Sequence, residues 1–232
     1  MSDALASPPP EERRIVIVGR NSVLWSRIAD RLLALRPDTL AVGHGDIAGL
    51  RLGPGDRLWI FSYAPDAEAN RALFDRIAAL GAGHHVYLSS ATANIADRIR
   101  CYRYPAVKAQ GERDAADRLN AVTVRIGLIH DDPDELPGGI SAATRLDDLV
   151  ALMAAGARRP DEEGEAIHLY RLVERPFSGA VERTAFNLYG ALLRLAGTRP
   201  CLLRPLDLVL RTLGWRWYGY FRLSNEQCRT TT

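Results

Sequence analysis

The sequence predicts an α/β protein with a doubly wound parallel sheet, followed by a small, mostly helical C-terminal lobe. Up to about residue 175, short apolar runs rich in β-branched residues alternate with amphipathic segments. This alternation is typical of parallel strands joined by covering helices. From Pro176 onward it stops. We therefore expect a disordered lead-in over residues 1–12, a main domain over 13–175 and a small lobe over 176–232.

The first predicted elements are a strand, a turn and a helix. Residues 14–18 (RIVIV) form a β-branched run that ends at Gly19, and residues 23–35 carry apolar side chains at helical spacing. A weaker strand follows at residues 39–42, and a third at 57–62 after a Gly-Pro-Gly turn.

The later elements continue the same order along the chain. The predicted helices cover residues 66–80, about 105–119, 144–155 and 185–195, and the predicted strands cover 85–89, 121–126 and 166–172. A Pro-punctuated apolar stretch occupies residues 200–213. Such a sheet is Rossmann-like, and its ligands bind beyond the carboxyl ends of the strands. A binding site is therefore expected directly after Val18, Val42, Ser62, Ser89 and Ile126.

Composition excludes several classes of protein. The chain is 47% hydrophobic and 25% charged, with a net charge of +2, which suits a globular protein and gives no reason to expect a nucleic-acid partner. Its three cysteines and five histidines lack the spacing of a disulfide framework or a metal site. No apolar run approaches a membrane span or a signal-peptide core, so we expect a cytoplasmic protein.

The C-terminal end is basic and aromatic. Between residues 199 and 232 the chain carries arginines at positions 199, 204, 211, 216, 222 and 229, interleaved with Trp215, Trp217, Tyr218, Tyr220 and Phe221. Such a surface is able to meet phosphates or an anionic membrane. The alternative is a solvated face whose aromatic side chains pack on the main domain.

A single lysine marks the candidate catalytic site. Of the 30 basic residues, 29 are arginine and only Lys108 is lysine, which points to a position where a compact ammonium with a tunable pKa is needed. Tyr104 lies four residues earlier, so the two side chains share a helical face. An ammonium stabilises a neighbouring phenolate, and Ser90, which follows the preceding strand, is able to hold a substrate oxygen. The three residues predict a proton-transfer site for carbinol and carbonyl chemistry.

Over residues 14–170 these features resemble the short-chain dehydrogenase/reductases, and more narrowly their extended branch of sugar-nucleotide epimerases, dehydratases and reductases. Residues 86–92 (VYLSSAT) resemble the serine strand of the family, residues 104–108 its catalytic helix, and Asn70 the asparagine of its preceding helix. Residues 125–127 (RIG) stand at its nicotinamide-side loop, and 145–148 (RLDD) resemble its later helix start.

The resemblance implies a role for each candidate residue and an assembly. Tyr104 would be the acid and base, Lys108 would lower its pKa and hold the nicotinamide ribose, and Ser90 would orient the substrate hydroxyl. The lobe over residues 176–232 would lie on the substrate side, and the protein would be a homodimer built through a four-helix contact. Ala91 and Thr92 follow Ser90 where family dehydratases place an Asp-Glu pair, so dehydration is disfavoured.

The cofactor turn departs from the family pattern. Of its three glycines only Gly19 remains, since Ser22 and Trp25 occupy the other two positions. The residues expected to bind the cofactor are Gly19, Arg20, Asn21, Ser22, Leu24, Tyr104 and Lys108. Because no acidic residue directly follows the strand at 39–42 and Arg20 lies in the turn, NADP is favoured over NAD.

The sequence thus supports three hypotheses. The leading one is an NAD(P)-dependent epimerase or ketoreductase that acts on a nucleotide-linked sugar or related polyol through Ser90, Tyr104 and Lys108. The second is a non-catalytic binding or scaffold protein on the same fold, because Trp25 would occupy space that the cofactor turn needs. The third is a membrane-surface enzyme that acts on a lipid-linked sugar through the basic aromatic C-terminal end.

Overall fold

The computed structural model describes residues 14–53, 55–61, 64, 66–81, 83–98, 102–155, 166–196, 205–206, 208–209, 212 and 219–231. Its main sheet has six strands, all parallel, in the order β2-β1-β3-β4-β5-β8. They are β1 (Ile15–Val18), β2 (Leu40–Val42), β3 (Arg57–Ile60), β4 (His84–Ser90), β5 (Val122–Ile126) and β8 (Ile167–Leu169). The predicted doubly wound, Rossmann-like sheet is confirmed.

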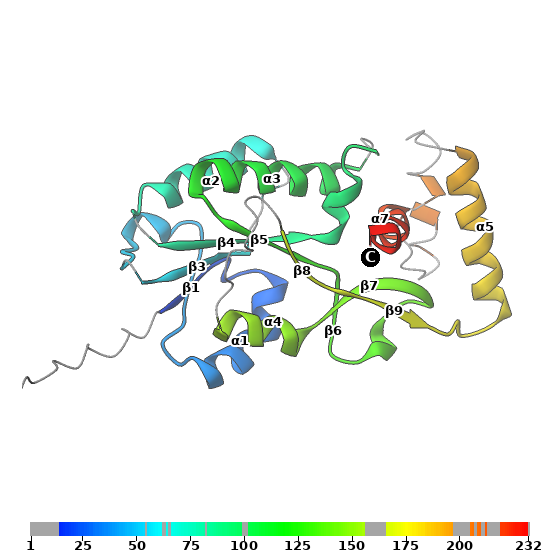
Figure 1. Ribbon diagram of the computed structural model, residues 1–232, viewed down its shortest axis with the longest axis horizontal. Helices are drawn as coiled ribbons and strands as arrows, with labels where there is room; N and C mark the ends of the chain where they lie inside the picture. Colours follow the sequence, from blue (N-terminus) through cyan, green and yellow to red (C-terminus); the bar gives the residue numbers. More distant parts are fainter. Residues whose placement is uncertain are drawn as a thin grey trace, which may run out of the picture.

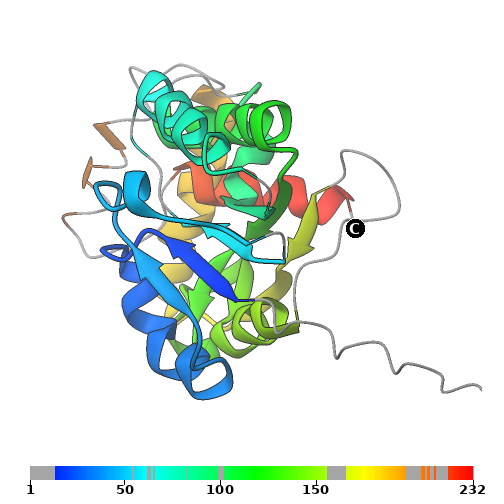
Figure 2. The ribbon, with the colours of Figure 1, turned by 90° about the vertical axis from the view of Figure 1, so that its left-hand side faces the viewer.

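Helices cover both faces of this sheet, as Figures 1 and 2 show from two sides. α1 (Val23–Leu35) and α4 (Leu146–Ala155) lie on one face, and α2 (Ala67–Ala78) and α3 (Arg103–Leu119) lie on the other. Every side chain of β1 is buried, because Ile15 and Ile17 pack toward α1 and α4 whereas Val16 and Val18 pack toward α2 and α3.

The strand order places a topological switch point between β1 and β3. The chain leaves β1 in one direction to form β2 and then returns to form β3 on the other side of β1. Helices therefore leave the neighbouring carboxyl ends of β1 and β3 on opposite faces, which opens a crevice there. The strand order places β2 at the edge of the sheet. Among the described residues between β2 and β3, the chain forms the short 3₁₀ helix η1 (Ile47–Gly49).

A second sheet, which the sequence did not predict, adjoins the first. It has the order β6-β7-β9, with β6 (Leu128–His130), β7 (Gly139–Arg145) and β9 (Arg171–Arg175). β7 begins with Gly-Ile-Ser-Ala-Ala, a set of mostly small residues with weak strand propensity, yet five of its seven residues are buried. Tertiary packing rather than local preference therefore makes it a strand.

Two predicted elements differ from the structure as a result: one helix starts two residues later than predicted, and one predicted strand is wrong. The helix predicted for residues 144–155 begins only at Leu146, because Thr144 and Arg145 complete β7. The single strand predicted for 166–172 is two strands, since β8 ends at Leu169 in the main sheet and β9 begins at Arg171 in the second sheet. Alternating polar and apolar residues do not reveal where a chain changes sheets.

The C-terminal lobe contains α5 (Ala180–Ala196) and α7 (Gly219–Thr231), which lie beside the second sheet at one end of the molecule (Figure 1). α5 is longer at both ends than the predicted 185–195. The predicted lead-in, most of the apolar stretch over 200–213, and Cys101, Cys201, Trp215, Trp217 and Tyr218 lie outside the described residues. Within the described ranges, no helix combines the length and apolar character that crossing a bilayer requires.

Gly127 joins the two sheets through a close backbone approach. It follows β5, and its N–H donates to the Thr144 hydroxyl at 2.9 Å. A Cβ atom here would lie 2.2 Å from the carbonyl oxygen of Ala142 and 2.7 Å from the backbone nitrogen of Ala143. Since backbone atoms cannot move aside as a flexible side chain can, this position requires glycine.

Candidate active site

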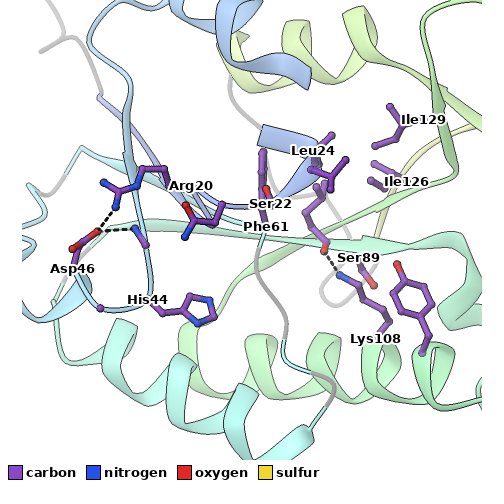
Figure 3. A pocket seen from close by; sticks show the side chains of 17 residues that line it. Arg20, Ser22, Leu24, His44, Asp46, Phe61, Ser89, Lys108, Ile126 and Ile129 are labelled. Atoms are coloured by element: carbon purple, nitrogen blue, oxygen red, sulfur yellow. Dashed lines mark hydrogen bonds and ion pairs between the residues drawn. The ribbon is translucent and has the colours of Figure 1, made fainter. Parts of the chain in front are cut away.

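A cavity of about 790 Å³ opens at the switch point, at the carboxyl ends of the main strands. Its volume lies within the range of small-molecule and cofactor sites. Figure 3 shows the side chains that line it, which come from the β1–α1 turn, the segment after β2, the ends of β3, β4 and β5, β6, and α3. The lining residues are Gly19, Arg20, Asn21, Ser22, Val23, Leu24, Gly43, His44, Gly45, Asp46, Phe61, Leu88, Ser89, Tyr104, Lys108, Ile126 and Ile129.

The β1–α1 turn brings the N-terminus of α1 to this cavity. Gly19 has φ +130°, a conformation that L side chains rarely adopt, so the one glycine that the turn retains stands where the backbone requires it. Ser22 is the N-cap of α1, and its hydroxyl accepts a hydrogen bond from the Trp25 N–H at 3.1 Å. A hydroxyl that accepts one bond still has its own hydrogen to donate, and a helix N-terminus favours an anion.

Trp25 does not line the cavity. Its half-buried side chain packs instead against the hydrophobic cluster between the sheet and α1 and α4. The indole therefore leaves the space beside Ser22 open.

At one end of the cavity, Arg20 and Asp46 form an ion pair. Their side chains are 3.3 Å apart and are 55% and 51% exposed, and the Asp46 carboxylate also accepts from the Gly43 N–H at 3.0 Å. The chain after β2 therefore turns back, so that Asp46, four residues beyond the end of β2, lies near the carboxyl end of that strand. Figure 3 shows Arg20, Asp46 and His44 at this end, away from Lys108 and Ser89.

Lys108 lies at the opposite end and is buried, with 5% of its surface exposed. Its ammonium donates to the carbonyl oxygen of Leu88 at 3.0 Å and lies 5.2 Å from the centroid of the Tyr87 ring. Burial lowers the pKa of Lys108 from 10.5 to about 8, and the attraction of Glu112 partly offsets this change. Lys108 is thus a cation at pH 7 that loses its proton at a lower pH than an ordinary lysine side chain.

Tyr104 and Lys108 lie on the same face of α3, and both line the cavity. The helix begins at Arg103, two residues earlier than predicted, so half-buried Tyr104 belongs to its first turn. The Tyr104 ring packs against Tyr220 of α7, with ring centroids 6.0 Å apart.

Of the two serines that end β4, it is Ser89 that lines the cavity. Ser90 is 8% exposed, and its hydroxyl accepts from the Thr92 hydroxyl at 3.0 Å, at the start of η2 (Ala91–Ile95). The catalytic role of Ser90 stays a prediction, and Ser89 joins it as a hydroxyl beside Lys108.

The other residues singled out from the sequence have structural partners. The Arg125 guanidinium binds Glu112 of α3 through two bonds of 2.9 and 2.6 Å. The Asn70 side chain exchanges hydrogen bonds with the backbone of Ala64. Asp147, in the first turn of α4, pairs with Arg31 of α1 at 3.1 Å.

Groups of three or more histidine, cysteine or acidic side chains placed to hold a metal ion are absent from the residues that the structure describes. The one cysteine among them, Cys228, is buried and not in a disulfide.

Sequence reasoning missed several of the lining residues. His44, Asp46, Phe61 and Ile129 belong to the cavity, and none of them matches a motif. Position alone was the available signal, since most of them follow strands whose carboxyl ends were expected to carry a site.

Together the fold and the cavity define a class: a doubly wound α/β protein with an open site at its switch point. No protein-family model and no curated protein matches the sequence. The structure is similar to a short-chain dehydrogenase/reductase superfamily protein from Agrobacterium tumefaciens with bound NAD, at 13% identity and a TM-score of 0.51, over 78% of this chain and 83% of that one.

It is also similar to the UDP-N-acetylglucosamine 4-epimerase from Bacillus cereus, at 10% identity and a TM-score of 0.50, over 77% of this chain and 85% of that one. At such low identities the similarity establishes the fold. The chain thus shares its overall fold with these two proteins.

Proposed function

We propose that this protein is an NAD(P)-dependent epimerase or ketoreductase that acts on a nucleotide-linked sugar or related polyol. One observation carries the proposal: the only lysine of the chain and Tyr104 line the same cavity as the N-terminus of α1. A proton-transfer pair and an anion-binding helix end are the two halves that hydride chemistry on a carbinol needs. The NAD-bound and sugar-nucleotide-active proteins of the same fold are consistent with it.

The Tyr104 phenol is the proposed acid and base for the substrate hydroxyl. Lys108, held by the Leu88 carbonyl, places a positive charge at the same end of the cavity and favours the phenolate. Ser90, or Ser89 on the cavity wall, would hold the substrate oxygen. A nicotinamide dinucleotide, when bound, supplies hydride transfer. Ala91 and Thr92 after Ser90 offer no acid for elimination, so epimerisation or reduction is favoured over dehydration.

The β1–α1 turn is the proposed pyrophosphate site. Gly19 allows the backbone to approach, and Asn21 and Ser22 add polar groups at the positive end of α1. Leu24 and Ile129 give this part of the cavity an apolar wall.

Val23→Glu should weaken the binding of NADPH and NADH at least tenfold. Val23 lines the cavity at the first position of α1 and is 79% exposed, so a carboxylate there repels a pyrophosphate. An acidic residue in the first helical turn stabilises the helix, and the loss therefore does not arise from unfolding. The measurement is a fluorescence titration of each cofactor.

The matched control is Leu35→Glu, which adds the same charge at the far end of α1 and should leave both dissociation constants within twofold. Equal weakening by the two variants, or no binding to the parent protein, would contradict the proposed site. Turnover is then sought as epimerisation of UDP-N-acetylglucosamine, followed by chromatography, and as NADPH oxidation with a 4-keto nucleotide sugar.

A preference for NADP is part of the proposal and depends on Arg20. Arg20→Ala should weaken NADPH binding about tenfold and leave NADH within twofold, because the guanidinium would meet the 2′-phosphate through charge-assisted bonds that partial exposure weakens. Asp46→Asn should act in the opposite sense and favour NADPH, since Asp46 competes for Arg20. Parallel titrations of both cofactors test this, and equal losses of NADH and NADPH would overturn the preference.

The other hypotheses are separable by the same experiments. A non-catalytic scaffold, which Trp25 and the lost glycines of the turn motivate, predicts no cofactor binding. The position of Trp25 outside the cavity lining counts against it. Association with a membrane surface and a homodimer stay proposals, tested by liposome flotation and by light scattering.

A further inference from the structure

The last described helix, α7, packs beside the segments that carry Ser90 and Tyr104. It contacts η2, β7 and β9, and Figure 1 shows it between the main sheet and α5. η2 begins directly after Ser90. A helix far along the chain thus adjoins the proposed proton-transfer site.

Two buried contacts tie α7 to η2. The Ser224 hydroxyl donates to the Ala91 carbonyl oxygen at 2.9 Å, and the Asn94 side-chain amide donates to the Cys228 sulfur at 3.2 Å. Ala91 is the neighbour of Ser90, so the turn that follows the predicted catalytic serine is anchored to α7.

The Asn225 side chain sets how α7 faces the second sheet. Its carbonyl accepts from the Ala142 N–H and its amide donates to the Ile140 carbonyl, each at 3.0 Å. Because one side chain bonds two backbone groups of β7, it fixes the orientation of α7 about its own axis. In this orientation Tyr220 lies toward the start of α3.

Tyr220 contacts two tyrosines there. Its ring centroid lies 5.2 Å from that of Tyr102 at an interplanar angle of 66° and 6.0 Å from that of Tyr104 at 36°. Tyr102 is the N-cap residue of α3, and Tyr104 belongs to the first turn. Tyr220 is not among the residues that line the cavity, so it has no cofactor contact there to lose.

We propose that Tyr220 is a positioning residue, which holds the Tyr104 ring in the orientation that presents its hydroxyl to the cavity. This rests on the proposed role of Tyr104 in proton transfer. One side of Tyr104 faces the open cavity, so a group that packs against the ring selects among the rotamers that the helical backbone allows. Tyr220 is such a group, and the contacts of α7 with η2 and β7 keep it in place. Displacing an acid or base by about 1 Å is enough to lower turnover strongly.

The direct test is ¹⁹F NMR of protein labelled with 3-fluorotyrosine. The Tyr104 resonance is the one that disappears in Tyr104→Phe. In Tyr220→Leu this resonance should move toward its position in the unfolded chain and become narrower, whereas in Tyr220→Phe, which keeps the ring, it should stay in place. Phe186→Leu is the matched control, because it removes a ring of the same lobe that packs against Phe177 and Arg222. An unchanged Tyr104 resonance in Tyr220→Leu would overturn the proposal.

The kinetic arm separates this proposal from the proposed function. Tyr220→Leu should lower kcat roughly tenfold with KM for NADPH within twofold, and Tyr220→Phe should restore the parent kcat. If Tyr104→Phe keeps full turnover, the proposed function fails. The NMR result still shows whether Tyr220 restrains the Tyr104 ring. If Tyr104→Phe is inactive but Tyr220→Leu has the parent kcat, the positioning role alone fails. Tyr220→Met, which keeps a large apolar side chain, replaces Tyr220→Leu if thermal unfolding shows that variant to be unfolded.

Discussion

Tyr104→Phe is expected to lower turnover about a thousandfold while the affinity for NADPH changes less than about threefold. General acid and base catalysis contributes roughly 10²- to 10⁴-fold, and phenylalanine removes only the group that exchanges the proton. The ring keeps its volume and its contact with Tyr220, so the fold should be retained. The measurements are kcat with the active sugar nucleotide and the dissociation constant of NADPH.

Tyr102→Phe is the matched control for this substitution. Tyr102 lies two residues earlier, is buried and does not line the cavity, so loss of its hydroxyl should leave kcat within about twofold. Undiminished turnover in Tyr104→Phe would contradict the assignment of Tyr104 as the acid and base. An equal loss in the two variants would point to a structural effect at the start of α3.

The second large effect concerns Lys108 and the pH dependence of stability. Burial lowers its pKa from 10.5 to about 8, so the unfolded chain binds this proton more tightly than the folded chain. Below pH 8 the folded protein carries the full cost of a buried ammonium, and this cost disappears as the pH rises from about 8 to 10.5. At 1.36 kcal/mol per pH unit the change amounts to about 3 kcal/mol.

Lys108→Met isolates this change. The stability of the parent relative to Lys108→Met should increase by about 3 kcal/mol between pH 7 and about pH 10.5, measured by urea unfolding. Lys108→Arg is the control, because its guanidinium stays protonated over that range. The difference in stability between Lys108→Arg and Lys108→Met should therefore not change with pH. If the difference in stability between the parent and Lys108→Met also stays constant with pH, Lys108 is not desolvated in the folded protein.

From the sequence, the position of the site could be predicted better than the side chains that line it. The rule that ligands bind at the carboxyl ends of parallel strands led to the segments after β1, β2 and β5, and Gly19, Asp46 and Ile129 of those segments line the cavity. The structure shows why serine is tolerated at position 22, where the family pattern has glycine: Ser22 is the N-cap of α1, a position that favours serine.

Other features depend on contacts that no local pattern contains. The Arg20–Asp46 pair forms only because the chain turns back after β2, and β7 is a strand only because β6 and β9 pair with it. Which of Ser89 and Ser90 faces the cavity depends on the direction of the last residue of β4, and a serine pair in sequence leaves that undecided. Trp25 was expected to occupy space that the cofactor turn needs, but its half-buried side chain packs against the core cluster instead.

A single buried lysine also determines how the protein responds to amine-directed chemistry. Since lysine occurs only at position 108, acylating or alkylating reagents have one side-chain amine to modify besides the α-amino group of the chain. The pKa of about 8 makes this amine nucleophilic near neutral pH, whereas its burial limits access. Mass spectrometry after brief labelling would therefore report accessibility at one atom, and a bound cofactor should appear as protection of that atom without any assay of turnover.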